Sequence, residues 1–236
     1  MLDTAFWKKY FKVYDVLNLV VPYQELIKEF INQLKLEAGQ KVLDAGCGTG
    51  NLGVHISRLG CHVTGVDFSR EALDQYRIKI KKNKTKLILS DLSKELPFRD
   101  NSFDRVVSNN VLYTIELGKR ENLIKEMYRV LKPGGVIVLS NVKYGWSPFT
   151  IYKKHIQTEY RRIGFIKLIL KIVGMAVPTL KMFYYNFKIQ QENTFGNYNF
   201  FKPKEQAGLL EKAGFKNVSN DISTYAGQAV MNSAKK

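Results

Sequence analysis

Cysteine and histidine are scarce in this chain of 236 residues, which holds two of the first and three of the second. Cys47 and Cys61 lack the close spacing of a zinc site or a redox pair, so neither a disulfide framework nor a metal centre is expected. The first residues contain no apolar stretch of signal-peptide length. The most apolar later segment, 163–180, is interrupted by two lysines and a proline. The sequence therefore predicts a cytoplasmic protein without a membrane-spanning helix.

Acidic residues are also few, with 21 Asp and Glu against 37 Lys and Arg, which gives a net charge of +16. A charge of this size favours an anionic partner such as a nucleic acid, an anionic membrane surface or an acidic substrate. A generally basic surface without a specific partner is the alternative.

Strand and helix patterns alternate over most of the chain. Residues 5–35 are predicted to be helical, with Pro22 in a first helical turn. Apolar strands are predicted at 41–44, 62–66, 86–89, 103–108 and 136–139, with helices at 51–59, at 69–82 and around 123–131. A last helix opens at 202–205, and two short antiparallel strands, 216–223 and 225–231, end the chain. This alternation predicts an α/β fold whose mostly parallel sheet has helices on both faces.

Residues 142–201 interrupt the alternation. The simplest division is one domain, 1–236, with N-terminal helices in 1–38 and an inserted helical lid at 142–201 before the last helix. The insertion holds 14 of the 29 aromatic residues and nine Lys or Arg, against Glu159 and Glu192. It is expected to cover the acceptor site, and its charge allows peripheral contact with an anionic membrane. A plain cap packed on the sheet is the alternative.

A glycine-rich loop follows the first predicted strand. Gly46, Gly48 and Gly50 let the backbone turn sharply and approach a ligand closely. Their spacing is tighter than that of the dinucleotide fingerprint, which predicts a ligand without a pyrophosphate. Asp67 ends the next strand, where an acid can accept hydrogen bonds from both ribose hydroxyls.

These segments resemble the motifs of the class I S-adenosylmethionine-dependent methyltransferases, in the branch that acts on quinones, sterols, phospholipids and other small molecules. The resemblance lies in five segments in order, namely Val42–Gly50, Val66–Ser69, Ser90–Leu92, Phe103–Asn110 and Leu131–Gly135. It covers about residues 36–140 and 200–231. It implies a Rossmann-like sheet of seven strands and the cofactor S-adenosylmethionine.

The resemblance also implies a role for individual residues. Those expected to contact the cofactor are Tyr14, Asp44, Gly46, Gly48, Asp67, Phe68, Asp91, Leu92 and Asn109. Asp44 would orient the methionine amino group, Asp67 would hold the ribose, and Phe68 and Asp91 would hold the adenine. A turn cap is the alternative for Asp91, and a buried helix aromatic is the alternative for Tyr14.

Methyl transfer from a sulfonium relies on alignment and exclusion of water, and it needs a strong base only when the acceptor must lose a proton early. Base candidates are accordingly few: Tyr113 and Glu116 after the fourth strand, and His155 in the insertion. The predicted reaction is transfer to the nitrogen or oxygen of a small, hydrophobic or lipid-like acceptor. Methylation of RNA by the basic surface is the alternative, followed by a non-catalytic cofactor-binding subunit.

Overall fold

The computed structural model describes residues 2–80 and 85–236. Within these residues, seven strands form one sheet in the order β3-β2-β1-β4-β5-β7-β6. The first five strands run parallel, β7 is antiparallel to β5, and β6 is antiparallel to β7. The strands are β1 (Lys41–Ala45), β2 (His62–Asp67), β3 (Thr85–Leu89), β4 (Phe103–Asn109), β5 (Leu131–Val142), β6 (Ile222–Thr224) and β7 (Ala229–Lys235). The mostly parallel sheet predicted from the alternation is confirmed.

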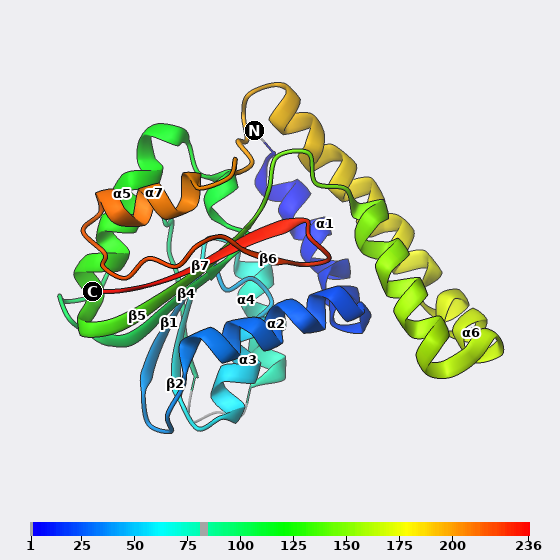
Figure 1. The fold of residues 1–236 in the computed structure, drawn as a ribbon, viewed down its shortest axis with the longest axis horizontal. Coiled ribbons are helices and arrows are strands. Elements are labelled where there is room, and N and C mark those ends of the chain that lie inside the picture. The colour runs from blue at the N-terminus through cyan, green and yellow to red at the C-terminus, as the bar shows by residue number, and fades with distance from the viewer. Residues whose placement is uncertain (1, 81–84) are drawn as a thin grey trace.

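Helices cover both faces of this sheet, with α5 and α7 on one face and α2 and α3 on the other (Figure 1). The helical segments are α1 (Thr4–Tyr14), η1 (Asp15–Leu19), α2 (Val21–Leu34), α3 (Asn51–Arg58), α4 (Arg70–Lys79), η2 (Leu112–Thr114), α5 (Leu117–Val130), α6 (Pro148–Thr194) and α7 (Glu205–Lys212). Pro22 lies in the first turn of α2, as predicted. The helix predicted at 69–82 is capped by Ser69, and its last two residues lie outside the described part of the chain.

The strand order reverses beside β1, which pairs with β2 on one side and β4 on the other. Val42 and Leu43 of β1 and Val106 and Val107 of β4 are fully buried, because helices cover both faces of the sheet there. At such a reversal the connections leave in opposite directions, so a crevice opens at the carboxyl ends of the strands. This crevice is where the glycine-rich loop lies.

The strands at the end of the chain differ from the prediction. Most of 216–223 is irregular, and only residues 222–224 form β6; the last strand starts at Ala229 instead of Tyr225. The cause is a turn between them, in which Tyr225, Ala226 and Gly227 all have positive φ. That backbone conformation cannot continue a strand. The predicted antiparallel pairing of the two strands is nevertheless confirmed.

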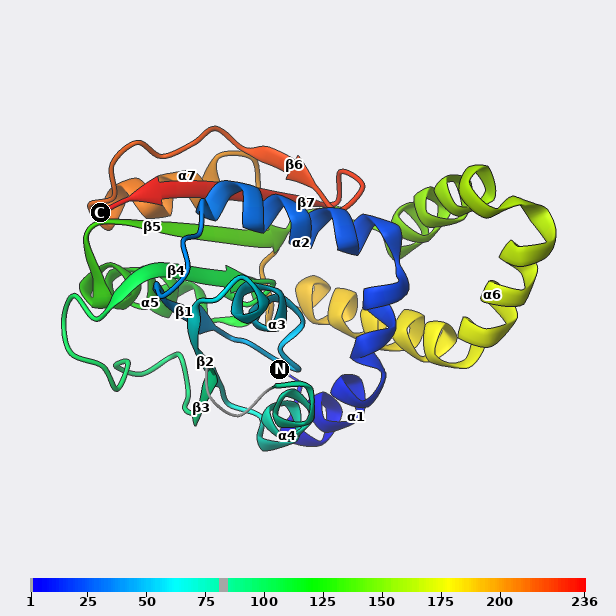
Figure 2. The ribbon, with the colours of Figure 1, turned by 90° about the horizontal axis from the view of Figure 1, so that it is seen from below.

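Residues 148–194 form the long helix α6, so the insertion is helical as expected. The helix is broken at Gly164, whose φ of 75° and ψ of 175° are not helical, and Pro178 lies further along it. Figure 2 shows α6 leaving the body beyond the end of β5, bending, and returning beside α1. In the described part of the chain its main contacts are with α1, η1 and α2.

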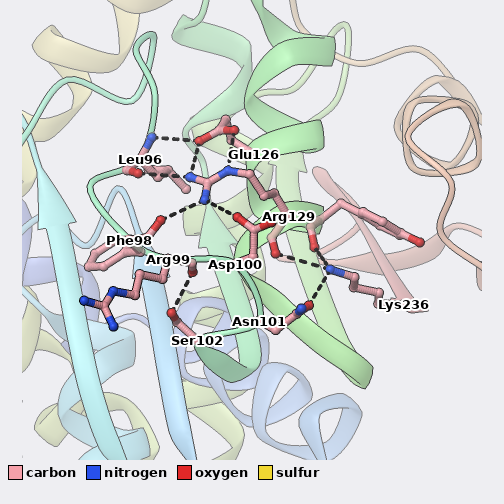
Figure 3. A network of polar contacts seen from close by, with 10 residues as sticks. Leu96, Phe98, Arg99, Asp100, Asn101, Ser102, Glu126, Arg129 and Lys236 are labelled. Atoms are coloured by element: carbon pink, nitrogen blue, oxygen red, sulfur yellow. Dashed lines mark hydrogen bonds and ion pairs between the residues drawn. The ribbon is translucent and has the colours of Figure 1, made fainter.

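At the amino ends of the parallel strands, the side chain of Arg129 near the end of α5 binds the loop that precedes β4. Its guanidinium donates hydrogen bonds to the carbonyls of Leu96 and Phe98 and to the carboxylates of Asp100 and Glu126, at 2.7–3.0 Å (Figure 3). Lys236 donates to the carbonyls of Tyr128 and Arg129 in the same region. These bonds fix the 96–102 loop and the chain end at the edge away from the crevice.

Candidate active site

A cavity of about 330 Å³ lies in the crevice at the carboxyl ends of β1, β2 and β4. The loop after β3, the segment after β4 and α1 complete its walls. All nine residues expected to contact a cofactor line it, namely Tyr14, Asp44, Gly46, Gly48, Asp67, Phe68, Asp91, Leu92 and Asn109. The structure therefore brings the sequence-predicted residues together in one place, although the contact of each with the cofactor stays a prediction.

The glycine-rich loop forms one wall of this cavity, and its backbone requires glycine at two positions. Gly46 and Gly50 both have φ of 80°. A Cβ on Gly46 would lie 2.2 Å from the Val111 side chain, and one on Gly50 would lie 2.1 Å from the Tyr76 ring. Both the left-handed conformation and the close packing thus require glycine.

Two buried carboxylates, Asp44 and Asp67, face the loop. Asp67 accepts hydrogen bonds from the N–H groups of Gly48 at 2.8 Å and Ser69 at 2.9 Å. Burial raises the pKa of Asp67 to about 6. Burial, together with the nearby charge of Asp67, raises the pKa of Asp44 to about 7. Two acids at such close quarters favour a ligand that carries positive charge.

Unpartnered polar atoms at the same place fit a polar ligand. Within the described residues, Oδ2 of Asp44 and Oδ1 of Asn109 are buried without a hydrogen-bond partner. A buried acceptor without a donor is costly, so a ligand that donates hydrogen bonds is the natural complement. The amino group, ribose hydroxyls and sulfonium charge of S-adenosylmethionine meet these requirements.

The far side of the polar region is bounded by Phe68 and the loop after β3. Phe68 is half-exposed, and its ring meets the edge of Trp7 with centroids 6.3 Å apart. Leu92 is buried, and Asp91 accepts a hydrogen bond from the Ser93 N–H at 2.9 Å. Asp91 thus forms the local turn bond that was its alternative role, and its carboxylate also lines the cavity.

Seven aromatic side chains besides Phe68 line the same cavity. They are Trp7, Tyr10, Phe11, Tyr14, Tyr23, Tyr113 and Tyr198, and the first four come from α1. The rings of Tyr14 and Tyr23 pack edge to face with centroids 6.3 Å apart, and those of Tyr113 and Tyr198 do so at 6.0 Å. This group of seven, the aromatic lining, gives flat apolar walls with a few hydroxyl groups.

The structure places most of the insertion outside the cavity wall. The inserted residues 142–201 were expected to form the lid, but among them Tyr198 alone lines the cavity. The aromatic face of α1 takes this place, with the Phe11 ring within 3.3 Å of the Cβ position at Gly48. The insertion's richness in aromatic residues suggested a lid, whereas most of those residues lie on α6 away from the crevice.

Two of the three candidate catalytic residues lie at the cavity. Tyr113 and Glu116 line the cavity. Burial raises the pKa of Tyr113 well above its ordinary value, so its phenol stays protonated and can donate a hydrogen bond. Glu116 is exposed and lies 2.8 Å from Lys119.

His155, the third candidate, is not among the residues that line the cavity. His155 is buried where α6 meets α2, and its Nδ1 accepts a hydrogen bond from the Val21 N–H at 3.2 Å. Burial lowers its pKa, which suits the neutral acceptor form. The side chain therefore fixes α6 to the body of the protein.

Sequence reasoning missed Arg120, which supports the aromatic lining from behind. Its buried guanidinium donates hydrogen bonds to the carbonyls of Tyr113 and Asn199, and it stacks 4.9 Å from the Phe201 ring centre. Burial lowers its pKa to about 10. An arginine on a helix otherwise looks like a surface residue, and the sequence offers no signal that residues 113 and 199 meet.

Comparison with known proteins agrees with this geometry. Residues 43–139 match the family model described as a methyltransferase domain, type 11. The chain is 31% identical over 218 residues to the demethylmenaquinone methyltransferase of Staphylococcus aureus, a match that covers 88% of this chain and 82% of that protein. The chain belongs to the class I S-adenosylmethionine-dependent methyltransferases, and S-adenosylmethionine is its cofactor.

Solved structures share the fold. A SAM-dependent methyltransferase from Thermotoga maritima aligns with a TM-score of 0.62 and 18% identity, covering 98% of this chain and 99% of that one. The phosphoethanolamine N-methyltransferase 2 of Haemonchus contortus, in complex with phosphomonomethylethanolamine and S-adenosylhomocysteine, aligns with a TM-score of 0.58 and 18% identity. That match covers 90% of this chain and 52% of the other.

Proposed function

We propose that this methyltransferase acts on a small, apolar, quinone-type acceptor bound at the aromatic lining of the cavity. The observation that carries the proposal is that tyrosine, tryptophan and phenylalanine side chains line the same cavity as the residues expected to hold the cofactor. The relative in S. aureus, whose name gives a demethylated menaquinone as its substrate, supports the same class of acceptor.

A quinone-type ring suits these walls physically. Its flat faces can stack on Tyr113 or Phe11, and its ring oxygens can meet the hydroxyls of tyrosines that line the cavity. Because Tyr113 stays protonated, it would donate a hydrogen bond to a ring oxygen. An apolar enclosure also excludes water from the reacting atoms.

Glu116 in the cavity wall is the base candidate that this acceptor would use. When bound, S-adenosylmethionine supplies a methyl group already activated by a sulfonium, so alignment is the main requirement. The reduced form of a quinone is electron-rich at its ring carbons through its own oxygens. The methyl group would then go to a ring carbon, and not to the nitrogen or oxygen expected from the sequence. The bond between sulfur and the methyl group breaks, S-adenosylhomocysteine leaves, and the hydrogen on that ring carbon departs as a proton, for which Glu116 in the cavity wall is the available acceptor.

The test is a transfer assay with purified protein, labelled S-adenosylmethionine and a reduced demethylated quinone that carries a short prenyl tail. We expect label in the quinone product. The variant Tyr113→Phe should bind the cofactor normally and raise the KM for the quinol, because only the phenolic hydroxyl is removed.

Phosphoethanolamine and bulk transfer RNA serve as competing acceptors. Methylation of phosphoethanolamine without the quinol would replace the acceptor class. Methylation of RNA alone would favour the nucleic-acid alternative that the positive charge raised.

A further inference from the structure

One segment of α6 presents apolar side chains to solvent. Between Gly164 and Pro178 lies a short helical segment, residues 165–177, here called the α6 tip. Ile166, Leu170, Val173 and Val177 are 63–75% exposed. Their spacing places them along one side of the helix. Leu168 and Met175 lie on the other side and are buried, so the tip is apolar on both sides and only one is covered by this chain.

The tip is too short to cross a bilayer. By length and composition α6 includes a window apolar enough for a membrane span, and 11% of that window is buried. Gly164 breaks the helix and Pro178 lies inside it, and the segment between these two residues has 13 residues, a length of about 20 Å. A hydrocarbon core is about 30 Å thick. Such a segment fits in the plane of a membrane interface, with one side in the lipid.

The exposed charged residues of α6 near the tip are all basic. Lys153, Lys154, Arg161, Lys167 and Lys181 are all exposed on α6. The nearby acid, Glu159, is buried and held by Arg162 and Lys171, each at 2.7 Å. The negative charge is therefore neutralised inside the bend, and the exposed surface beside the apolar side is positive.

We propose that the α6 tip docks on an anionic lipid bilayer, with the exposed aliphatic side chains below the head groups and the lysines and arginines at the lipid phosphates. Basic residues around an apolar helix side match this surface, since each contributes attraction to anionic lipid. A second copy of the chain fits less well, because its tip would bring the same positive charge to the contact.

Docking in this way also orients the active site. α6 leaves the sheet beyond the end of β5, on the side of the crevice, and its return leads to Tyr198 in the cavity wall (Figure 2). The carboxyl edge of the sheet would then face the lipid. The docking itself depends only on α6 and on no particular acceptor, so it goes beyond the proposed function.

The test is co-sedimentation with vesicles of phosphatidylcholine alone and of phosphatidylcholine mixed with phosphatidylglycerol. We expect binding to the mixed vesicles that declines with added salt. The double variant Leu170→Glu with Val173→Glu should lower the partition coefficient at least about tenfold, because two charges replace apolar groups that would enter the lipid. Reversal of Lys167 and Lys181 to Glu should remove the preference for anionic lipid.

The matched control is Ile78→Glu, since Ile78 is an aliphatic residue of α4 that is 86% exposed and lies outside α6. This variant should bind vesicles like the unchanged protein. All variants should bind S-adenosylhomocysteine normally, because the tip contributes no side chain to the cavity. Unchanged protein that ignores mixed vesicles would overturn the proposal. So would a dimer that the double variant dissociates, which would make the tip a contact between copies.

Discussion

At the scale of single residues, the site depends on two acids whose charge is suppressed by burial. The pKa values of Asp44 and Asp67 are both raised above the ordinary value of an aspartate. Asp44 lies in β1, and Asp67 is the last residue of the neighbouring strand β2. A cationic cofactor favours their ionised forms, so binding and ionisation are coupled. The two residues nonetheless have different neighbours and different roles.

The first prediction concerns Asp67. Its replacement in Asp67→Ala removes the acceptor for the ribose hydroxyls and leaves the Gly48 N–H without a partner. Affinity for S-adenosylmethionine should fall by about 1–3 kcal/mol, or about 5- to 150-fold, when measured by calorimetry. Asp74→Ala on exposed α4 is the control and should bind as before. Equal affinities of the two variants would contradict the assignment.

The second prediction concerns pH. With pKa values of about 6 and 7, Asp67 and Asp44 are largely protonated at pH 5.5 and ionised at pH 8. Cofactor affinity should therefore rise over this range, and binding near pH 7 should release protons. Calorimetry in two buffers with different ionisation heats measures that release. Proton uptake, or an affinity independent of pH, would contradict the coupling.

The same shifts affect the stability of the free protein. Both pKa values lie above those in the unfolded chain, so from about pH 4 to pH 7 the folded state binds more protons than the unfolded state. The free energy of unfolding should then fall as pH rises through this window. Bound cofactor should offset the loss at its upper end.

The sequence predicted these acids because the glycine-rich loop and the strand ends are local features. It could not predict the aromatic lining in the same way. Trp7, Tyr10 and Phe11 line the cavity because α1 packs over the crevice, against α4 and α6. That placement depends on contacts between segments far apart in the sequence, so the spacing of residues within 4–14 cannot predict it.

At the scale of elements, two arginines on α5 act at opposite ends of the helix. Arg120 connects η2 to the segment after α6, and Arg129 connects the 96–102 loop to the helix end. Arg120 acts mainly through carbonyl oxygens, and Arg129 through two carbonyls and two carboxylates. A forked guanidinium reaches several such acceptors at once and an ammonium does not. The two arginines differ in that only Arg120 supports residues of the cavity.

The third prediction compares Arg120→Lys with Arg129→Lys. Each should lower the free energy of unfolding by about 1–3 kcal/mol in urea titrations, because the charge is kept but some carbonyl bonds are lost. Turnover per folded molecule should fall only in Arg120→Lys, since Tyr113 and Asn199 lose a shared anchor. A turnover loss of equal size in both variants would show that α5 affects the site through overall stability.

Element boundaries were predictable where a local stop signal exists. Helix α3 follows Gly50, and α4 begins at its Ser69 cap, close to the predicted limits. The strand predicted at 216–223 is mostly irregular because Lys216, Ser219 and Ile222 pair with Lys235, Ser233 and Met231, so that three residues of the segment run beside every two of β7. Strand pairing is decided by the neighbour, so a single segment cannot specify it.

At the scale of the whole molecule, an α/β body carries the cavity and α6 projects from it (Figure 1). The body was predictable, because repeated strand and helix patterns leave few ways to build a parallel sheet. The position of α6 was not, since an apolar and aromatic helix suits either a lid or a projecting surface. What decides between them is which side chains face the crevice, and only Tyr198 of the insertion does.

The fourth prediction follows from this division. S-adenosylhomocysteine at about 100 times its Kd should stabilise the folded state by about 2.7 kcal/mol. Hydrogen exchange should then slow in α1, in the glycine-rich loop and in the segment after β4, which line the cavity. Exchange in residues 165–177 should be unchanged, because this segment contributes no residue to the cavity wall. Protection of the α6 tip on ligand binding would instead show that α6 closes over the cavity, as the sequence alone had suggested. The experiment therefore distinguishes a lid from a surface that acts independently of the cofactor.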